Sequence, residues 1–227
     1  MFHKASTLRF KTLEELSTVY CSWAEMHIRN DNIDSAIQIL KHACNKPAKK
    51  SAESGSLMYN INAWSLYIDL LESQGEFELT KSAYERVMTL KIATPGTVLN
   101  FADFLQRNRF YEESFRVYER AVLLFEWPRV YEIWLIYISK MVEKYAGSKL
   151  ERIRHLFEQA LKGCPVDQSK LFMYMYADFE ENFGLLSHAM EIYERAVNLM
   201  KQGLELVECI NVYIAKATQF FGIAKTR

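Results

Sequence analysis

Histidine and cysteine are the residue types of this chain that could supply a metal site or a nucleophile. The five histidines are His3, His27, His42, His155 and His188. No two of them form an H-x-x-x-H pair, so their spacing indicates no metal site. The four cysteines are Cys21, Cys44, Cys164 and Cys209, and none is part of a C-x-x-C pair. We therefore expect free, buried thiols in a reducing compartment, with no metal and no disulfide framework.

Cys164 and His155 are the two side chains that most resemble reactive groups. Cys164 precedes Pro165, but the sequence places no base for it, so we expect a buried or half-buried thiol. His155 stands one residue before the apolar pair Leu156 and Phe157. We expect it to have a structural role at the solvent edge of a helix.

Adjacent acidic residues could act as an acid–base pair only if their side chains met. The three pairs are Glu14–Glu15, Glu112–Glu113 and Glu180–Glu181. Residues i and i+1 of a helix do not face each other, so we expect these pairs to form solvated faces. The chain also contains no G-x-G-x-x-G or G-x-x-x-x-G-K-[S/T] motif that would hold phosphate. The sequence therefore predicts a protein that is not an enzyme and that uses no cofactor.

Aromatic side chains could instead stack on nucleic-acid bases, and Leu171 to Tyr176 (LFMYMY) is the richest run of this kind. At helical spacing such a run is more typical of a packed core. The 28 basic and 28 acidic residues cancel, so net charge does not favour binding to RNA or to an anionic membrane. No run of 18 apolar residues predicts a membrane span.

A short segment that recurs along the chain indicates how all these residues are positioned. It reads Tyr-Glu-Arg-Ala at 118–121 and 193–196, Tyr-Glu-Arg-Val at 84–87, and more loosely Phe-Glu-Gln-Ala at 157–160 and Leu-Lys-His-Ala at 40–43. The steps between successive copies are 44, 34, 39 and 36 residues. Self-similarity at a period of about 20–50 residues is the mark of a solenoid of repeats.

A second pattern precedes each copy, with a large apolar residue at i and an aromatic residue at i+3 on one helical face. The apolar residues are Tyr20, Trp64, Val98, Trp134, Met173 and Ile210, and Glu25, Asp69, Asp103 and Asp178 follow two residues after the aromatic. Each repeat is thus a first helix with this pattern and a second helix with the Tyr-Glu-Arg-Ala segment. We expect a repeat core of twelve aromatic side chains: Trp23, Trp64, Tyr67, Tyr84, Phe101, Tyr118, Trp134, Tyr137, Phe157, Tyr176, Tyr193 and Tyr213.

Helix ends are marked by residues that break or cap helices. First helices should end near Asn30, Gly75, Asn108, Gly147, Gly184 and Gly222. Second helices are followed by Pro47, Pro95, Pro128 and Pro165, which are all the prolines of the chain. Capping boxes are predicted at Thr12 to Glu15 and at Ser148 to Glu151. The repeats then span about 12–47, 57–95, 96–128, 129–165 and 166–203, with a half repeat at 204–227.

These marks predict an all-α fold, a right-handed α-α superhelix of antiparallel helix pairs in a single array over residues 1–227. The half repeat supplies a first helix only, so we expect exposed apolar surface there, covered by further repeats of a longer protein, by a partner or by a second copy. The polar segment Asn45 to Ser56 carries Lys46, Lys49 and Lys50. It is either a mobile surface loop or a basic finger that touches RNA or an acidic partner.

The paired signatures resemble the half-a-tetratricopeptide (HAT) repeat, most closely at Ser114 to Ala121 and Ala189 to Ala196. Longer strings resemble the Syf-type splicing factor family, whose animal members are also called XPA-binding HAT proteins. These strings are 91–95, 111–115, 120–128 and 149–165. The chain departs from the repeat at Ser139, Lys140, Ala215 and Lys216, which replace the acidic residue and its apolar neighbour.

This resemblance implies a nuclear, non-catalytic scaffold of the NineTeen complex that acts in pre-mRNA splicing. It implies spliceosomal protein partners, including other NineTeen-complex and intron-binding subunits, and a link to transcription-coupled repair. The first seven residues lack the apolar segment of a secretory signal, which agrees with a cytoplasmic or nuclear protein. The alternative is a HAT-repeat RNA-processing scaffold that forms homodimers or binds RNA directly.

Overall fold

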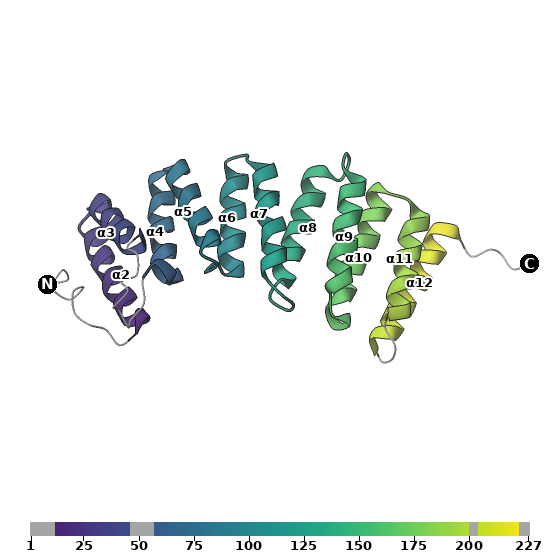
Figure 1. Ribbon diagram of the computed structural model, residues 1–227. Helices are drawn as coiled ribbons and strands as arrows, with labels where there is room; N and C mark the ends of the chain where they lie inside the picture. Colours follow the sequence, from purple (N-terminus) through teal and green to yellow (C-terminus); the bar gives the residue numbers. More distant parts are fainter. Residues whose placement is uncertain (1–11, 46–56, 200–203, 223–227) are drawn as a thin grey trace, which may run out of the picture. The chain divides into compact units, whose positions relative to one another are not determined.

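The computed structural model describes residues 12–45, 57–199 and 204–222 of the 227-residue chain. These residues form eleven α-helices and one short 3-10 helix, and none of them lies in a β-strand (Figure 1). The all-α prediction is therefore confirmed. The chain divides into two compact units, an N-terminal unit (residues 1–109) and a C-terminal unit (residues 110–227). The basic segment predicted at 46–56 lies outside the described residues.

In the N-terminal unit, each α-helix packs against the next one along the chain. Its elements are α2 (Leu13–Arg29), α3 (Ile33–Asn45), η1 (Leu57–Tyr59), α4 (Ile61–Gln74), α5 (Phe77–Thr89) and α6 (Pro95–Arg107). Helices α2, α4 and α6 are the predicted first helices, and α3 and α5 are predicted second helices.

The C-terminal unit follows the same rule. Its helices are α7 (Tyr111–Leu124), α8 (Tyr131–Tyr145), α9 (Leu150–Gly163), α10 (Val166–Phe183), α11 (Leu186–Leu199) and α12 (Leu204–Phe221). Helices α8, α10 and α12 carry the first-helix pattern, and α7, α9 and α11 carry the Tyr-Glu-Arg-Ala segment or its variant.

Most helix boundaries lie where the sequence predicts them. Thr12 caps α2 by accepting a hydrogen bond from the backbone N–H of Glu15 at 3.2 Å. Gly75 ends α4 with φ of 74°, a left-handed conformation that glycine adopts without a steric penalty. Pro95 is the first residue of α6, where its missing N–H has no helical partner to lose.

The capping box predicted at Ser148 is wrong. Helix α9 begins one residue later than that box requires, with Lys149 at the cap position and no side-chain cap. Ser148 Oγ instead donates back to the carbonyl oxygen of Tyr145 at 3.4 Å. A capping box that the sequence analysis missed lies at Thr94 and Thr97, whose side chains each accept from the other's backbone N–H.

Aromatic stacks join the second helix of one repeat to the first helix of the next. The rings of Tyr84 and Phe101 are stacked with centroids 4.7 Å apart in the N-terminal unit. In the C-terminal unit, the rings of Tyr118 and Tyr137 lie 5.2 Å apart, and those of Phe157 and Tyr176 lie 4.7 Å apart. A stack of this kind adds about 0.5–1.5 kcal/mol to the stabilisation from buried area alone.

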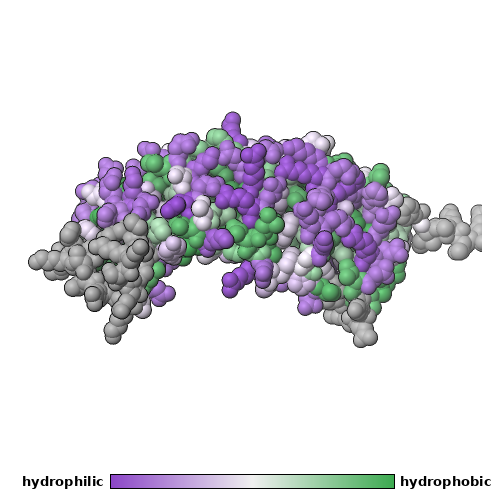
Figure 2. Space-filling view, in the orientation of Figure 1, coloured by the Kyte–Doolittle hydropathy of each residue, from purple (hydrophilic) through white to green (hydrophobic). Residues whose placement is uncertain are grey.

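Ten of the twelve expected core aromatics are buried, and Trp23 and Tyr213 are half-buried. On the surface, hydrophilic residues cover most of the visible face, and hydrophobic residues form smaller patches (Figure 2). Ile210 and Ile214 of α12 are among the exposed hydrophobic residues, at 37% and 55% exposure. Their equivalents are buried in all five other first helices: Tyr20 and Ala24, Trp64 and Ile68, Val98 and Ala102, Trp134 and Ile138, Met173 and Ala177. Helix α12 thus presents the apolar surface that the sequence predicts for the half repeat.

Candidate functional site

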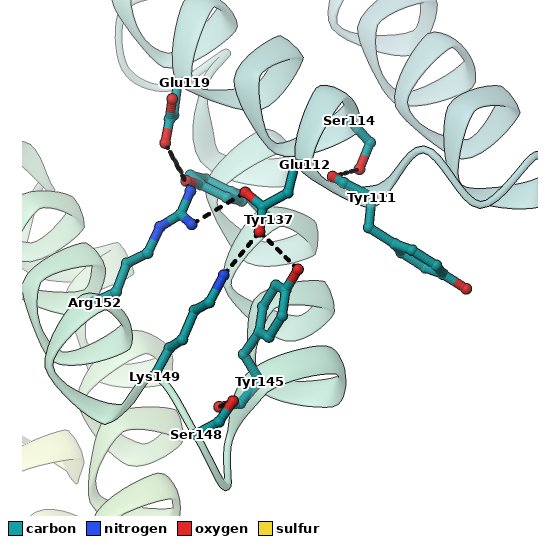
Figure 3. Close-up of polar contacts among 9 residues, drawn as sticks. All are labelled: Tyr111, Glu112, Ser114, Glu119, Tyr137, Tyr145, Ser148, Lys149 and Arg152. Atoms are coloured by element: carbon teal, nitrogen blue, oxygen red, sulfur yellow. Dashed lines mark hydrogen bonds and ion pairs between the residues drawn. The ribbon is translucent and has the colours of Figure 1, made fainter.

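A network of charged and phenolic side chains connects α7, α8 and α9 in the C-terminal unit (Figure 3). Glu112 and Glu119 are seven residues apart and therefore lie two turns apart on one face of α7. Arg152 of α9 reaches both carboxylates, with Nη1 3.3 Å from Glu112 and Nη2 3.2 Å from Glu119. One guanidinium group thus bridges two turns of the neighbouring helix.

Glu112 is the centre of this network. Lys149 Nζ donates to its Oε1 at 2.8 Å, and Tyr145 Oη donates to the same atom at 2.7 Å. Chiefly because of the hydrogen bonds from Lys149 and Tyr145, the pKa of Glu112 is lowered to about 2. The carboxylate is therefore ionised at neutral pH and is a poor proton acceptor.

The remaining groups of the network are also engaged. Tyr137 Oη donates to Glu119 Oε1 at 3.2 Å, and burial together with the Glu119 charge raises the pKa of this phenol. Lys144 lies 3.7 Å from the centroid of the Tyr111 ring, and Lys149 lies 3.8 Å from that of Tyr145. The geometry holds α7, α8 and α9 together.

A smaller motif occurs in both units and couples successive first helices. In the N-terminal unit, Glu72 of α4 accepts from Tyr84 Oη at 2.7 Å and pairs with Arg107 of α6 at 3.2 Å. In the C-terminal unit, Glu181 of α10 accepts from Tyr193 Oη at 2.6 Å and pairs with Lys216 of α12 at 2.6 Å. Neither site was predicted from the sequence, although in each case a glutamate stands twelve residues before the repeat tyrosine.

The Tyr-Glu-Arg-Ala segments also contribute ion pairs between repeats. Arg195 of α11 forms a two-bond pair with Glu158 of α9 at 2.6 and 3.0 Å. Glu158 and Glu119 occupy the same position in successive second helices, and each pairs with an arginine of the next second helix. These pairs are exposed, so each contributes only about 0–1 kcal/mol, and their main effect is on the register between helices.

The prediction that Glu180 and Glu181 form a solvated face is wrong. The Glu180 side chain is 0% exposed and the Glu181 side chain is 13% exposed. Arg154 of α9 donates to both oxygens of Glu180, from Nε at 2.6 Å and from Nη2 at 2.8 Å. Burial raises the pKa of Glu180, but the hydrogen bonds from Arg154 and from the backbone N–H of Leu185, together with the charge of Arg154, leave the pKa below its usual value.

The two candidate reactive residues have different environments. Cys164 is half-buried, and burial raises the pKa of its thiol to about 11, so the nucleophilic thiolate is scarce at neutral pH. His155 is exposed, and its Nε2 lies 2.9 Å from Nε2 of Gln159. All four cysteines are free, with Cys44 and Cys209 buried. In the described part of the chain, no three His, Cys, Asp or Glu side chains are placed to hold a metal ion.

The aromatic run at 171–176 contributes mainly to the core. Phe172, Met173 and Tyr176 are buried, Tyr174 and Met175 are half-buried, and Leu171 is exposed. Among the described helices, none has the length and apolar character needed to cross a membrane.

Comparison with known proteins gives one family over the entire chain. The family model of the Pre-mRNA-splicing factor Syf1/CRNKL1 C-terminal HAT repeat matches residues 1–227. The chain is 40% identical to Pre-mRNA-splicing factor SYF1 of Homo sapiens, with 100% of this chain and 27% of that protein covered. It is also 40% identical to Pre-mRNA-splicing factor cwf3 of Schizosaccharomyces pombe, with 100% and 30% covered. The chain therefore spans less than a third of the length of these relatives.

Solved structures similar to this chain include tetratricopeptide-repeat proteins. YrrB, a TPR protein with an unusual peptide-binding site, aligns with a TM-score of 0.44 and 12% identity over 92% of this chain and 97% of its own. Yeast Tom70 aligns with a TM-score of 0.44 and 18% identity over 89% of this chain and 40% of its own.

Proposed function

The chain belongs to the Syf1/CRNKL1 C-terminal HAT-repeat family, and from this premise we propose that it is a non-catalytic protein-interaction scaffold of pre-mRNA splicing. The single observation that carries this proposal is the family match over residues 1–227, together with about 40% identity to splicing factors of distant organisms. We further propose that both compact units belong to one HAT-repeat array with the repeat boundaries given above.

The side-chain chemistry supports a scaffold rather than an enzyme. Glu112 and Glu180, the acidic residues with lowered pKa values, are held in ion pairs between helices. The twelve core aromatics act structurally in this proposal, since ten of them are buried and six of them stack between successive repeats. A repeat array of this kind presents many weak contacts over a large area, and a few buried anchors at each interface supply most of the binding energy.

The proposed setting is the nucleus, within the NineTeen complex, with other subunits of that complex and intron-binding proteins as partners. The family's animal members give transcription-coupled repair as a second setting for the same scaffold. Direct RNA binding is the less favoured role, because the formal net charge of the chain is zero.

The test is a tagged pull-down of this chain from nuclear extract, with and without nuclease, quantified by mass spectrometry. We expect spliceosomal proteins to be recovered and to remain after nuclease treatment. A Phe157→Ala variant is the control for folded repeats, because loss of its buried ring should loosen α9 and α10 and reduce recovery.

Two other results would change the proposal. Recovery that disappears with nuclease would mean that RNA links the proteins to the chain, and direct RNA binding would replace protein scaffolding. Recovery of no splicing protein in either sample would contradict the proposed function. Light scattering on the purified chain separately tests whether it forms a homodimer.

A further inference from the structure

The turn between α10 and α11 presents a cluster of large apolar side chains to solvent. Phe183 is 46% exposed, Leu185 is 55% exposed and Leu186 is 42% exposed. Single exposed apolar residues are ordinary on protein surfaces. Three within four positions form a patch, and such patches mark interaction sites.

Three other turns between a first and a second helix contain no large apolar residue, and the α6–α7 turn has a single one, Phe110, which is 41% exposed. Residues 30–32 are Asn-Asp-Asn, 75–76 are Gly-Glu and 147–149 are Gly-Ser-Lys. An aromatic residue follows the α4–α5 turn, but Phe77 stacks on Phe104 of α6 with centroids 5.3 Å apart. At the α10–α11 turn, the apolar side chains point to solvent instead.

The buried carboxylate of Glu180 binds the backbone of this turn. Glu180 Oε2 accepts a hydrogen bond from the backbone N–H of Leu185 at 3.3 Å, and the Glu180 carbonyl accepts from Gly184 N–H at 2.9 Å. A Cβ atom at residue 184 would overlap Glu180 Oε2, so the close approach requires glycine. Arg154 of α9 fixes the same carboxylate, so the turn is anchored to a third helix.

The repeat comparison shows that the core itself does not require this carboxylate. The equivalent residues in three other first helices are Leu71, Leu105 and Met141, and all three are buried and apolar. An apolar side chain at this position is at least as stabilising as a buried ion pair, which carries a large desolvation penalty. We therefore attribute to Glu180 the role of fixing the conformation of the turn.

The exposed charges around the turn are mainly negative. Glu151, whose side chain is 84% exposed, pairs with Arg154 at the edge of the turn. Asp178 and Glu191 are exposed on the two helices that the turn joins. His188 of α11 is a basic residue beside them, with its side chain 44% exposed and its Nδ1 3.8 Å from Glu180 Oε2. Arg154 donates to both oxygens of Glu180, so its positive charge is largely balanced by that carboxylate and adds little outside the turn.

We propose that Phe183, Leu185 and Leu186 form a preformed docking knob for a protein partner that has an apolar pocket with a basic rim. The inference rests on the proposed scaffold function and adds the place and chemistry of one contact. Because the turn is already fixed in the free chain, little conformational entropy is lost when the partner binds. The knob inserts apolar side chains, and the surrounding carboxylates face the basic rim.

The first experiment places a photo-crosslinking amino acid at position 185 and, as a matched control, at position 123. Leu123 lies on α7 of the same unit and is 87% exposed. The partner that crosslinks from position 185 is then expressed, and its affinity is measured for the unmodified chain and for Leu185→Ser and Leu123→Ser variants. We expect Leu185→Ser to weaken binding roughly tenfold or more, as for an interface anchor, and Leu123→Ser to leave it unchanged.

Two further variants test the chemistry of the partner and the role of the buried carboxylate. Glu151→Lys should weaken binding of a partner with a basic rim. The double variant Glu180→Leu with Arg154→Met should remain folded, because an apolar pair replaces the ion pair, but should bind several-fold more weakly. Circular dichroism and thermal melting verify the fold of each variant.

The outcomes separate this inference from the proposed function. Equal affinities for the unmodified chain and the Leu185→Ser variant would overturn the docking knob, while recovery of splicing proteins would leave the scaffold function intact. Failure to recover any splicing protein would overturn both. Unchanged binding of the Glu180→Leu, Arg154→Met variant would overturn the preformed character of the knob.

Discussion

The glutamates Glu112 and Glu180 lie in two regions of the C-terminal unit and differ in their exposure to water. Glu112 is half-exposed and collects Lys149, Tyr145 and Arg152 across α7, α8 and α9. Glu180 is buried, and its carboxylate accepts two hydrogen bonds from Arg154 and one from the backbone N–H of Leu185. Water can replace the partners of Glu112 but not those of Glu180, so the same residue type should differ strongly in its effect on stability.

The largest effect should come from the aromatic core beneath the Glu112 region. Tyr118→Ala removes a buried ring that stacks on Tyr137 and should lower the free energy of unfolding by about 3–5 kcal/mol. Urea denaturation of the variant and the unmodified chain measures this. Equal midpoints would contradict the assignment of Tyr118 to the repeat core.

Glu180→Ala should have the next largest effect, because it leaves the largely buried Arg154 with only the exposed Glu151 as an ion-pair partner. We expect a loss of about 3 kcal/mol, measured in the same denaturation assay. Glu112→Ala is the control, and it should lose far less. If the two variants lost the same stability, burial would not be what distinguishes the two glutamates.

Gly184→Ala tests the close approach of the turn to the Glu180 carboxylate. The added methyl group must displace the carboxylate or the turn, so we expect a loss of about 1–3 kcal/mol. The same substitution in the Glu180→Leu background measures the coupling between the two residues. Additive effects would show that Gly184 and Glu180 act independently.

Glu112→Ala and Arg152→Ala should each lower stability by only about 0–1 kcal/mol, because their ion pairs are accessible to water. Salt near 1 M shortens the Debye length to about 3 Å and should reduce even this difference. Thermal melting at low and high salt is the measurement. A loss that persists at high salt would place Glu112 in the same class as Glu180.

The smallest effect concerns pH. Because the pKa of Glu112 is lowered in the folded chain to about 2 from 4.5, its pairs stabilise the fold above about pH 4.5, and this contribution is lost as pH falls towards 2. The stability difference between the unmodified chain and Glu112→Gln should therefore shrink between pH 6 and pH 3. A difference that stays constant over this range would mean that the pKa is not lowered.

Much of the fold could be predicted from the sequence because helical spacing and helix-breaking residues are local signals. The aromatic positions of the first helices and the glycine at position 75 depend only on neighbours along one helix. The environment of Glu180 depends on Arg154, which is 26 residues away on another helix. Adjacent residues of a helix do not face each other, and this holds for Glu180 and Glu181. The rule could not reveal which side chains contact each of them.

The capping error at Ser148 has a similar cause. A serine three residues before a glutamate fits the capping box, yet Ser148 Oγ donates a hydrogen bond to the carbonyl oxygen of Tyr145 at the end of the preceding helix. The glutamates that bind the repeat tyrosines were missed because the signal, a spacing of twelve residues, becomes visible only once two antiparallel helices are in contact.

The stacks between successive repeats bear on how such a chain can change in length. The α8–α9 repeat offers one ring, Tyr137, to the repeat before it and one ring, Phe157, to the repeat after it. Duplication of a whole repeat supplies both rings at once and leaves every stack complete. Insertion of half a repeat would leave one ring without a stacking partner. Duplication of a whole repeat such as α8–α9 would thus lengthen the fold without breaking a stack.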